Sequence, residues 1–364
     1  MVRKSQATRR LSTLRRRTME NCTYVGLDLS KTSTMATAVD PLGHRIRQEK
    51  LGVSDEELLR FLGEIPGPKQ VVMEACNVWE HTYDAAASTG AEVLLANPLK
   101  VKLVSKTTLK TDKVDSEKLA LLARLNAIPE SYAPSPEQRA LRRLVRERVF
   151  YHAKWKAVAS HTYALLLQKG IPYRPEILTR RRLRGELRVH NIVEVNRGLD
   201  TLEKIEEISV PLDREIHRAY LASREAQLLA TIPGVGEFTS MTLVAFLCPI
   251  ERFYSLDAVV KYCGLCPSVR QSGERAFHGR LVWDCNVILK WVLIEGQWNV
   301  RLRERKGDVS RVARRVARRG AANDGAVAAA RKLVRICAAI LRRGTPYQPE
   351  SPGSSSRQVG HAAS

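Results

Sequence analysis

The sequence has no long hydrophobic run and no segment that resembles an export signal. No apolar stretch approaches the roughly 20 residues that a membrane-spanning helix needs. The N-terminal segment MVRKSQATRRLSTLRRRTME is basic but has no apolar core, which argues against a secretory signal. With 44% hydrophobic and 27% charged residues, the composition is that of a soluble globular protein long enough for two or three domains.

Cysteine is sparse as well. Seven cysteines are scattered over 364 residues, and an odd number without a regular framework indicates a reducing compartment. Cys263 and Cys266 have metal-ligand spacing, and His278 and Cys285 follow them. A second close pair of ligands is missing, so we interpret these cysteines as buried apolar side chains rather than a zinc site.

Acidic residues are few relative to basic ones. The chain has 38 Asp and Glu against 60 Lys and Arg, which gives a net charge of +22. This excess of basic residues gives information about binding partners rather than about the fold. It favours nucleic acid over an anionic membrane surface as the partner. We expect a cytoplasmic, nucleoid-associated protein of a prokaryotic cell.

The hydrophobic pattern predicts an α/β region followed by an all-α region. Predicted strands cover 23–30, 34–40, 44–53, 70–76 and 91–97, and predicted helices cover 55–65 and 79–89. Three hairpin-like strands followed by strand–helix alternation imply a mixed sheet with helices packed on it. The predicted parts are a basic flexible arm (1–21), the α/β domain (22–135), a helical-hairpin or coiled-coil arm (136–228), a helical C-terminal domain (229–343) and a disordered tail (344–364).

The predicted arm consists of two long, charged helical segments joined by a basic connector, 171–186. A solvated charged face is the simplest expectation for its arginines. After it, the P-G-V-G turn at 233–236 resembles a helix–hairpin–helix element, in which glycine amides approach a phosphate; a tight interhelical turn fits equally well. Nine of the nineteen residues from 301 to 319 are basic, which suits a phosphate-binding face.

Four carboxylates form an ordered set. Asp28 and Glu74 each end an apolar strand, where burial is costly unless a cation is present. Asp112 and Asp115 are three residues apart and so share one helical face. An all-oxygen ligand set suits Mg²⁺ or Mn²⁺, and two such ions about 3.5–4 Å apart clamp the oxygens of a phosphodiester.

Simpler interpretations exist for each acid alone. Asp112 and Asp115 fit solvent-exposed charges on a helix, and Asp28 fits the cap of a turn with Ser30 and Thr32. The stretch GLDLSKTST also resembles the first phosphate loop of actin-like sugar kinases. The second Asp-containing loop and the Gly-rich adenosine loop of those kinases are not found in the sequence, so the full set of acids favours the metal site.

The stretches YVGLDLSKTSTMATAVD, VVMEACNVWEHTYD and LKTDKVDSEKLALLAR resemble the N-terminal half of the DEDD transposases of the insertion-sequence one-ten type. IPGVGEFTSMTLVAFLCPIERFYSLDAVVKYCGLCPSVRQSGERAFHG resembles their second domain. The resemblance runs from about 22 to 345. It implies a RuvC-like ribonuclease-H fold, with Asp28, Glu74, Asp112 and Asp115 as the metal-binding tetrad.

The resemblance further implies a serine nucleophile that forms a covalent phosphoserine with DNA. The motif matches GLCPSVRQSG, so Ser272 carries this role; from the residues alone, Ser272 fits a turn residue and Ser268 is an equal candidate. A bridge RNA that guides donor and target DNA, and a homo-oligomer joined through the arm, are implied too. Trp283, Asp284 and Cys285 stand before Asn286 where the family has Lys and Gly.

We therefore expect a transposase or recombinase that cleaves and exchanges DNA strands under RNA guidance. Expected nucleic-acid contacts are Lys110, Lys113, Arg270 and Arg275. A hydrolytic RuvC-like junction resolvase or nuclease is the alternative within the enzyme class. A non-catalytic nucleic-acid-binding protein is the alternative outside it.

Overall fold

The computed structural model describes residues 22–104, 112–171, 174–272 and 275–349. It divides the chain into two compact units, which we call unit 1 (1–134) and unit 2 (135–364). The predicted basic arm, 1–21, lies outside the described residues. Among the residues that the model describes, no helix has both the length and the apolar character to cross a membrane.

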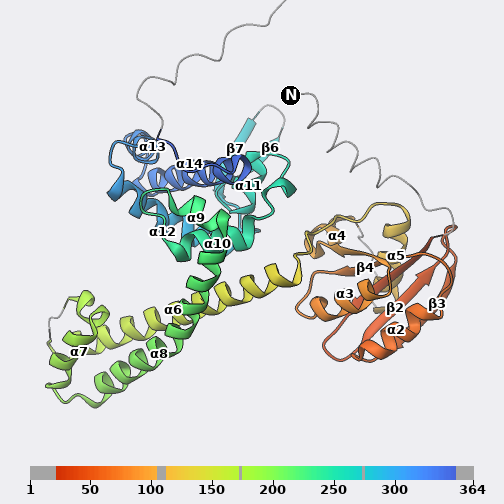
Figure 1. The fold of residues 1–364 in the computed structure, drawn as a ribbon, viewed down its shortest axis with the longest axis horizontal. Coiled ribbons are helices and arrows are strands. Elements are labelled where there is room, and N and C mark those ends of the chain that lie inside the picture. The colour runs from red at the N-terminus through yellow and green to blue at the C-terminus, as the bar shows by residue number, and fades with distance from the viewer. Residues whose placement is uncertain (1–21, 105–111, 172–173, 273–274, 350–364) are drawn as a thin grey trace, which may run out of the picture. The chain divides into compact units, whose positions relative to one another are not determined.

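Unit 1 contains a five-stranded mixed sheet in the order β3-β2-β1-β4-β5 (Figure 1). Its elements are β1 (Thr23–Leu29), β2 (Thr34–Val39), β3 (Arg45–Leu51), α2 (Asp55–Gly63), β4 (Lys69–Glu74), α3 (Trp79–Ser88), β5 (Glu92–Ala96), α4 (Pro98–Val104) and α5 (Asp112–Arg124). The first three strands are antiparallel, whereas β1, β4 and β5 are parallel. The mixed sheet expected from the sequence is confirmed.

The two faces of this sheet have separate cores because side chains alternate along each strand. One face carries Val25, Leu27, Val71 and Met73, which form a cluster with side chains of α2 and α3. The opposite face packs against α4 and α5 through a second cluster that includes Tyr24 and Val72. Helices therefore cover both faces of the sheet, as two separately buried faces require.

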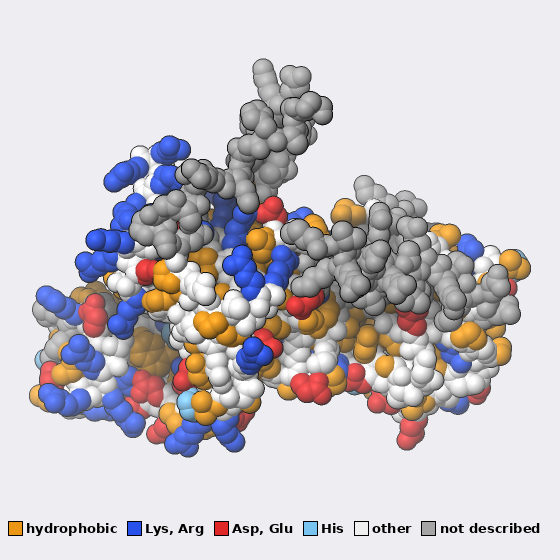
Figure 2. All heavy atoms as spheres, turned by 45° about the horizontal axis from the view of Figure 1, so that its top comes forward, with side chains coloured by type: hydrophobic (Ala, Val, Ile, Leu, Met, Phe, Trp, Pro, Cys, Tyr) orange, Lys and Arg blue, Asp and Glu red, His pale blue; other side chains and the backbone are white. Residues whose placement is uncertain are grey.

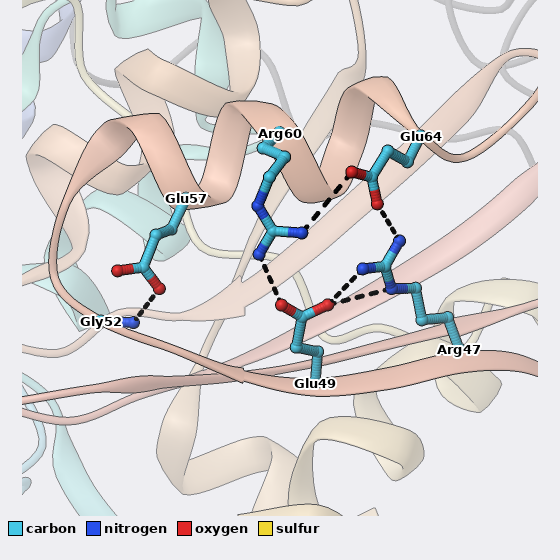
Figure 3. Close-up of polar contacts among 6 residues, drawn as sticks. All are labelled: Arg47, Glu49, Gly52, Glu57, Arg60 and Glu64. Carbon is cyan, nitrogen blue, oxygen red and sulfur yellow. Dashed lines mark hydrogen bonds and ion pairs between the residues drawn. The ribbon is translucent and has the colours of Figure 1, made fainter.

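The outer strand β3 is held to α2 by charged side chains (Figure 3). Glu49 pairs with Arg47 and with Arg60 of α2, and Glu64 pairs with the same two arginines. The hydrogen bond from Arg60, aided by that from Arg47, keeps the pKa of the Glu49 carboxyl below its usual value. Charged residues on an edge strand also discourage pairing with a further strand.

Unit 2 is almost entirely helical. Its elements are α6 (Pro136–Gln168), η1 (Pro175–Thr179), α7 (Arg181–Arg188), α8 (Val193–Ala222), α9 (Arg224–Ala230), α10 (Glu237–Leu247), η2 (Ile250–Arg252), α11 (Leu256–Tyr262), β6 (Pro267–Ser272), β7 (Arg275–Leu281), α12 (Val287–Arg303), α13 (Asp308–Ala317) and α14 (Ala322–Arg343). The long helices α6 and α8 are antiparallel: Arg148 pairs with Asp213, while Trp155, further along α6, bonds Glu206 earlier on α8.

Three arginines of this unit are buried, contrary to the expectation of a solvated face. Arg184 of α7 is 1% exposed, and its guanidinium bonds the carboxylate of Glu206 and the backbone carbonyl of Leu178. Arg139 and Arg142 on α6 are buried as well, and Arg142 Nε donates to the carbonyl oxygen of Ala245 at 2.8 Å. Part of the positive charge therefore holds unit 2 together.

The C-terminal helices surround a large apolar core that includes Phe246, Leu293 and Leu333. The expected disordered tail from 344 differs from the structure over 344–349. There, the Tyr347 hydroxyl donates to the Glu304 carboxylate at 2.9 Å, and the Tyr347 ring packs against the core. Residues 350–364 lie outside the described part of the chain.

The contact between β1 and α5 depends on Gly26. A Cβ at this position would lie 2.0 Å from the carbonyl oxygen of Ser116 and 2.6 Å from the amide nitrogen of Ala120, both backbone atoms of α5. We expect Gly26→Ala to lower the free energy of unfolding by about 1–3 kcal/mol, because overpacking here must move a helix. Faster amide hydrogen exchange in the peptide that contains β1 would show it.

Gly63→Ala is the matched control, because a Cβ at residue 63 would meet no atom within 4 Å. Alanine in a helix is favoured over glycine, so this variant should exchange as slowly as the parent chain or more slowly. Equal effects of the two substitutions would contradict the close packing of α5 on β1.

Candidate active site and nucleic-acid interface

Asp28 and Glu74 lie at the carboxyl ends of neighbouring parallel strands. In the β1–β4 ladder Leu27 is opposite Met73, so Asp28 and Glu74 are the next residues in register. Leu27 and Met73 point into the core beneath α2 and α3. Alternation therefore places both carboxylates on the other face, the one that α5 covers, and both residues are half-buried.

Helix α5 brings two more carboxylates toward this end of the sheet. The helix runs antiparallel to β1: Ser116 lies against Gly26, and Arg124, at the helix C-terminus, donates to the carbonyl of Pro41 at the opposite end. The first turn, with Asp112 and Asp115, therefore lies toward the end of β1 that carries Asp28. Asp28 and Glu74 are therefore on the sheet face that α5 covers, and the first turn of α5 lies toward the same end of the sheet.

Hydrogen bonds between polar side chains fix the position of α5 relative to β2 and β3. The hydroxyls of Thr37 and Ser116 are both buried, and their oxygens are 2.7 Å apart. Gln48 Nε2 donates to Thr37 Oγ1 at 2.9 Å and to the carbonyl of Lys113 at 3.0 Å. Strands β2 and β3 thus hold the same turn of α5 that bears the two acids.

The four acids are not drawn together as metal ligands. Asp112 is exposed, and Asp115 Oδ1 accepts a hydrogen bond from Lys118 Nζ at 2.8 Å. Within the ranges that the structure describes, no three or more His, Cys, Asp or Glu side chains form a group that could hold a metal ion. The donor set nevertheless fits a hard divalent cation, because it consists only of carboxylate oxygens.

The turn after β1, which Asp28 alone was suggested to cap, contains another capping residue. The turn after β1 is closed by Ser30, whose hydroxyl donates to the carbonyl of Ser33 at 2.7 Å and accepts from the Ser33 amide at 3.1 Å. Ser30 therefore provides a cap for this turn.

Ser272 is the last residue of β6, in an antiparallel pair of strands that the sequence pattern did not reveal. Its Cα partner across the ribbon is Arg275 of β7. The base of the ribbon is tied by the Val282 amide, which donates to the Cys266 carbonyl at 3.0 Å. The rival Ser268 packs across the ribbon, since a Cβ at Gly279 would lie 2.5 Å from its Oγ. The signal for this ribbon was the sequence Ser-Gly-Glu between two short alternating runs.

Of the expected nucleic-acid contacts, Lys113 is exposed in the first turn of α5, beside the acids. Arg270 and Arg275 belong to the ribbon of Ser272, one on each strand. Lys110 lies outside the described residues.

The cysteines near this ribbon are apolar packing groups. Cys263 and Cys337 are fully buried, and burial raises the pKa of the Cys337 thiol to about 12. Burial raises the pKa of Cys263 too, so these thiols stay protonated at neutral pH. Cys285 lies against Gly264, where a Cβ would come within 2.3 Å of its Sγ.

In the P-G-V-G turn between α9 and α10, the first glycine allows close packing against another helix. Gly234 has φ +91°, and a Cβ there would lie 2.6 Å from backbone atoms of Asn299 in α12. The close approach that a helix–hairpin–helix element offers to a phosphate is therefore taken by a helix at this position. The tight interhelical turn is the better interpretation.

Comparisons with known proteins agree with this arrangement. A family model described as "Transposase" of the DEDD IS110 type matches residues 25–170, and one described as "Transposase IS116/IS110/IS902 family" matches residues 226–311. The first match contains the four acids and the second contains Ser272. The fold and these matches define a DEDD transposase. The chain belongs to the IS110-type family of these enzymes.

Curated relatives cover nearly the whole chain. The transposase for insertion sequence element IS1111A of Coxiella burnetii is 24% identical, over 92% of this chain and 93% of its own length. A probable family 20 transposase of Pseudomonas aeruginosa is 26% identical, over 90% of this chain and 99% of its own length. The transposase for insertion sequence element IS1328 of Yersinia enterocolitica is 25% identical, over the same shares.

The buried Thr37–Ser116 pair provides a test of how α5 is held. Thr37→Val leaves the Ser116 hydroxyl without this partner and should lower the free energy of unfolding by about 1–3 kcal/mol. The double variant Thr37→Val, Ser116→Ala should lose less than the sum of the two single losses, because both polar groups are gone. Urea unfolding of all four chains measures the coupling. Strict additivity would contradict the hydrogen bond.

Proposed function

We propose that this chain is the transposase of an insertion sequence, which cleaves and exchanges DNA strands with a carboxylate-held metal and a serine nucleophile. The observation that carries the proposal is the placement of Asp28 and Glu74 on the face of a RuvC-like sheet that α5 covers. The first turn of α5 supplies Asp112 and Asp115 to the same end. The family matches support this assignment.

Asp28, Glu74, Asp112 and Asp115 would hold Mg²⁺ or Mn²⁺. When bound, such ions polarise the phosphodiester and assist ionisation of an attacking hydroxyl. The carboxylates would hold the cations that offset their mutual repulsion, and Lys113 contributes a positive charge beside them that attracts the phosphate. Lys118, which now bonds Asp115, gives that carboxylate a cation partner in this structure.

Ser272 is the proposed nucleophile. Its Oγ forms a bond to phosphorus while the bond between phosphorus and the 3′ oxygen breaks, and the serine proton passes to the departing 3′ oxygen. One phosphodiester is thereby exchanged for another, and no water is consumed. Arg270 and Arg275, on the two strands of the same ribbon, and Lys110 are proposed to contact the nucleic-acid backbone.

The acids belong to unit 1 and Ser272 to unit 2. We propose that a homo-oligomer, a dimer or tetramer joined through α6 and α8, brings Ser272 of one protomer to the acids of another. We also propose that a guide RNA pairs with donor and target DNA. Sequencing of RNA that copurifies with the protein tests this part, and a preparation that retains activity without RNA would refute it.

Asp28→Ala and Glu74→Ala should abolish strand cleavage with Mg²⁺ or Mn²⁺ and leave DNA binding intact, since each removes a metal ligand without touching the basic surface. Cleavage of a labelled DNA end and a gel-shift measurement report the two properties separately. Asp55→Ala, which removes an exposed acid of α2, is the control and should cleave normally. Cleavage that survives both substitutions would exclude the metal site.

Ser272→Ala should eliminate any protein–DNA adduct that survives denaturation, because the covalent bond forms at its Oγ. Ser268→Ala, from the same strand, should keep the adduct. Separation of the reaction on a denaturing gel is the measurement. An adduct in Ser272→Ala would refute the nucleophile, and metal-dependent cleavage without any adduct in the parent chain would favour the hydrolytic nuclease.

A further inference from the structure

A groove of about 200 Å³ lies between α12 and α13 in unit 2. One aromatic, one aliphatic, one hydroxyl and three guanidinium side chains line it: Trp298, Arg301, Leu302, Arg305, Ser310 and Arg314. None of them takes part in the proposed chemistry. The groove lies within the stretch of the chain richest in arginine, and Figure 2 shows basic side chains gathered on this side of the unit.

The groove contains a fixed planar platform. Trp298 is 46% exposed, and the guanidinium carbon of Arg301 lies 4.5 Å from the centre of its rings. Arg301 Nη1 also donates to Oε1 of Gln297 at 3.3 Å, and Gln297 is fully buried. Gln297 thus fixes the guanidinium, which lies over one face of the Trp298 rings and forms with them the positively charged stack that we call the platform.

Among the described residues, the acidic neighbours of the groove form no ion pair with its arginines. Glu304 accepts from the Tyr347 hydroxyl, and Asp308 pairs with Arg311 and with Lys332, the latter at 2.9 Å.

Across the described ranges of the chain, Arg301, Arg305 and Arg314 have no carboxylate partner. Arg314 Nη1 instead donates to the carbonyl of Arg305 at 2.9 Å, which orients its remaining donors. Arginines held in place without a counter-ion are suited to bind phosphate.

We infer that this groove binds one unpaired nucleotide of a single-stranded nucleic acid. The base stacks on the platform of Trp298 and Arg301, and Arg305 and Arg314 bind the adjacent phosphates. The inference rests on the proposed function for the presence of nucleic acid. A base inside a duplex has both faces covered by its neighbours, so only an unpaired base can stack on Trp298.

The size of the groove agrees with this occupant. Pockets for drug-sized ligands measure about 300–1,000 Å³, so this smaller groove accommodates one planar ring system rather than a whole cofactor. Leu302, which is 67% exposed, extends the apolar wall beyond the tryptophan. An acidic peptide would use the arginines but would gain little from the aromatic surface.

The test is binding of labelled adenine oligonucleotides of about 12 residues, within the usual single-strand site sizes, to the full chain. DNA and RNA strands form two arms, and a duplex of the same length forms the third. Trp298→Leu should weaken single-strand binding by about 5- to 100-fold and leave duplex binding unchanged. Trp298→Phe, which keeps an aromatic face, should recover most of the loss. The arm with the larger loss identifies whether DNA or RNA enters the groove.

Matched substitutions outside the groove complete the design. Tyr254→Leu removes an aromatic side chain that is 92% exposed and should change nothing. Arg314→Gln should weaken single-strand binding and reduce the slope of log affinity against log salt by about 0.7, whereas Arg318→Gln should leave single-strand affinity intact.

Two results would overturn the inference by showing that the groove binds something else, and unchanged single-strand binding in Trp298→Leu would overturn it as well. The first is an equal loss of single-strand and duplex binding in Trp298→Leu, and the second is competition by an oligoglutamate peptide that depends on Trp298 as strongly as the oligonucleotides do. If the parent chain bound no nucleic acid at all, the proposed function itself would fail. If single-strand binding did not depend on Trp298, the inference about the groove would fail and the proposed function would stand.

Discussion

The contact between the backbones of β1 and α5 at Gly26 is the constraint on which the arrangement of unit 1 depends. Without a side chain at this residue, the helix rests directly on the strand, two positions before Asp28. The hydrogen bond between Thr37 of the neighbouring strand β2 and Ser116 of α5 holds the helix at the same place. Because α5 runs antiparallel to β1, this one close approach brings the first turn of α5, with two acids, toward the ends of β1 and β4, which carry one acid each. A larger residue at 26 would lift the helix and its acids together.

Positive charge has two physical roles in unit 2. Arg184 is buried against Glu206 and Trp155. Partial burial tends to raise the pKa of the Glu206 carboxyl, but hydrogen bonds from Arg184 and Trp155 lower it below its usual value. Such an arginine cannot contact a partner. In the α12–α13 groove, by contrast, the described arginines have no carboxylate partner, and each bonds a neutral oxygen or none. A net charge of +22 therefore overstates the surface available for nucleic acid.

The local elements of unit 1 were predictable because each has a clear period and clear ends. Ser54 caps α2, and the strands follow alternating or continuous apolar runs. The ribbon of Ser272 was missed because its two strands are short and lie between helices, where the sequence Ser-Gly is the only local signal for them. The tail was misjudged at Tyr347 for a related reason: one aromatic side chain anchors a polar segment to a distant core, and no local pattern records that contact.

The sequence by itself determined the family, the strand and helix periods, and the order of the four acids. These follow from residue type and spacing alone. Only the tertiary structure decided which face the acids share, since that depends on the alternation within a particular register of β1 and β4. It also decided that Arg184 is buried while Arg301 stacks on an exposed Trp298, because burial is set by packing between segments far apart in the chain. Two arginines thus have different roles: Arg184 stabilises the fold, and Arg301 lies at the surface, where a ligand can reach it.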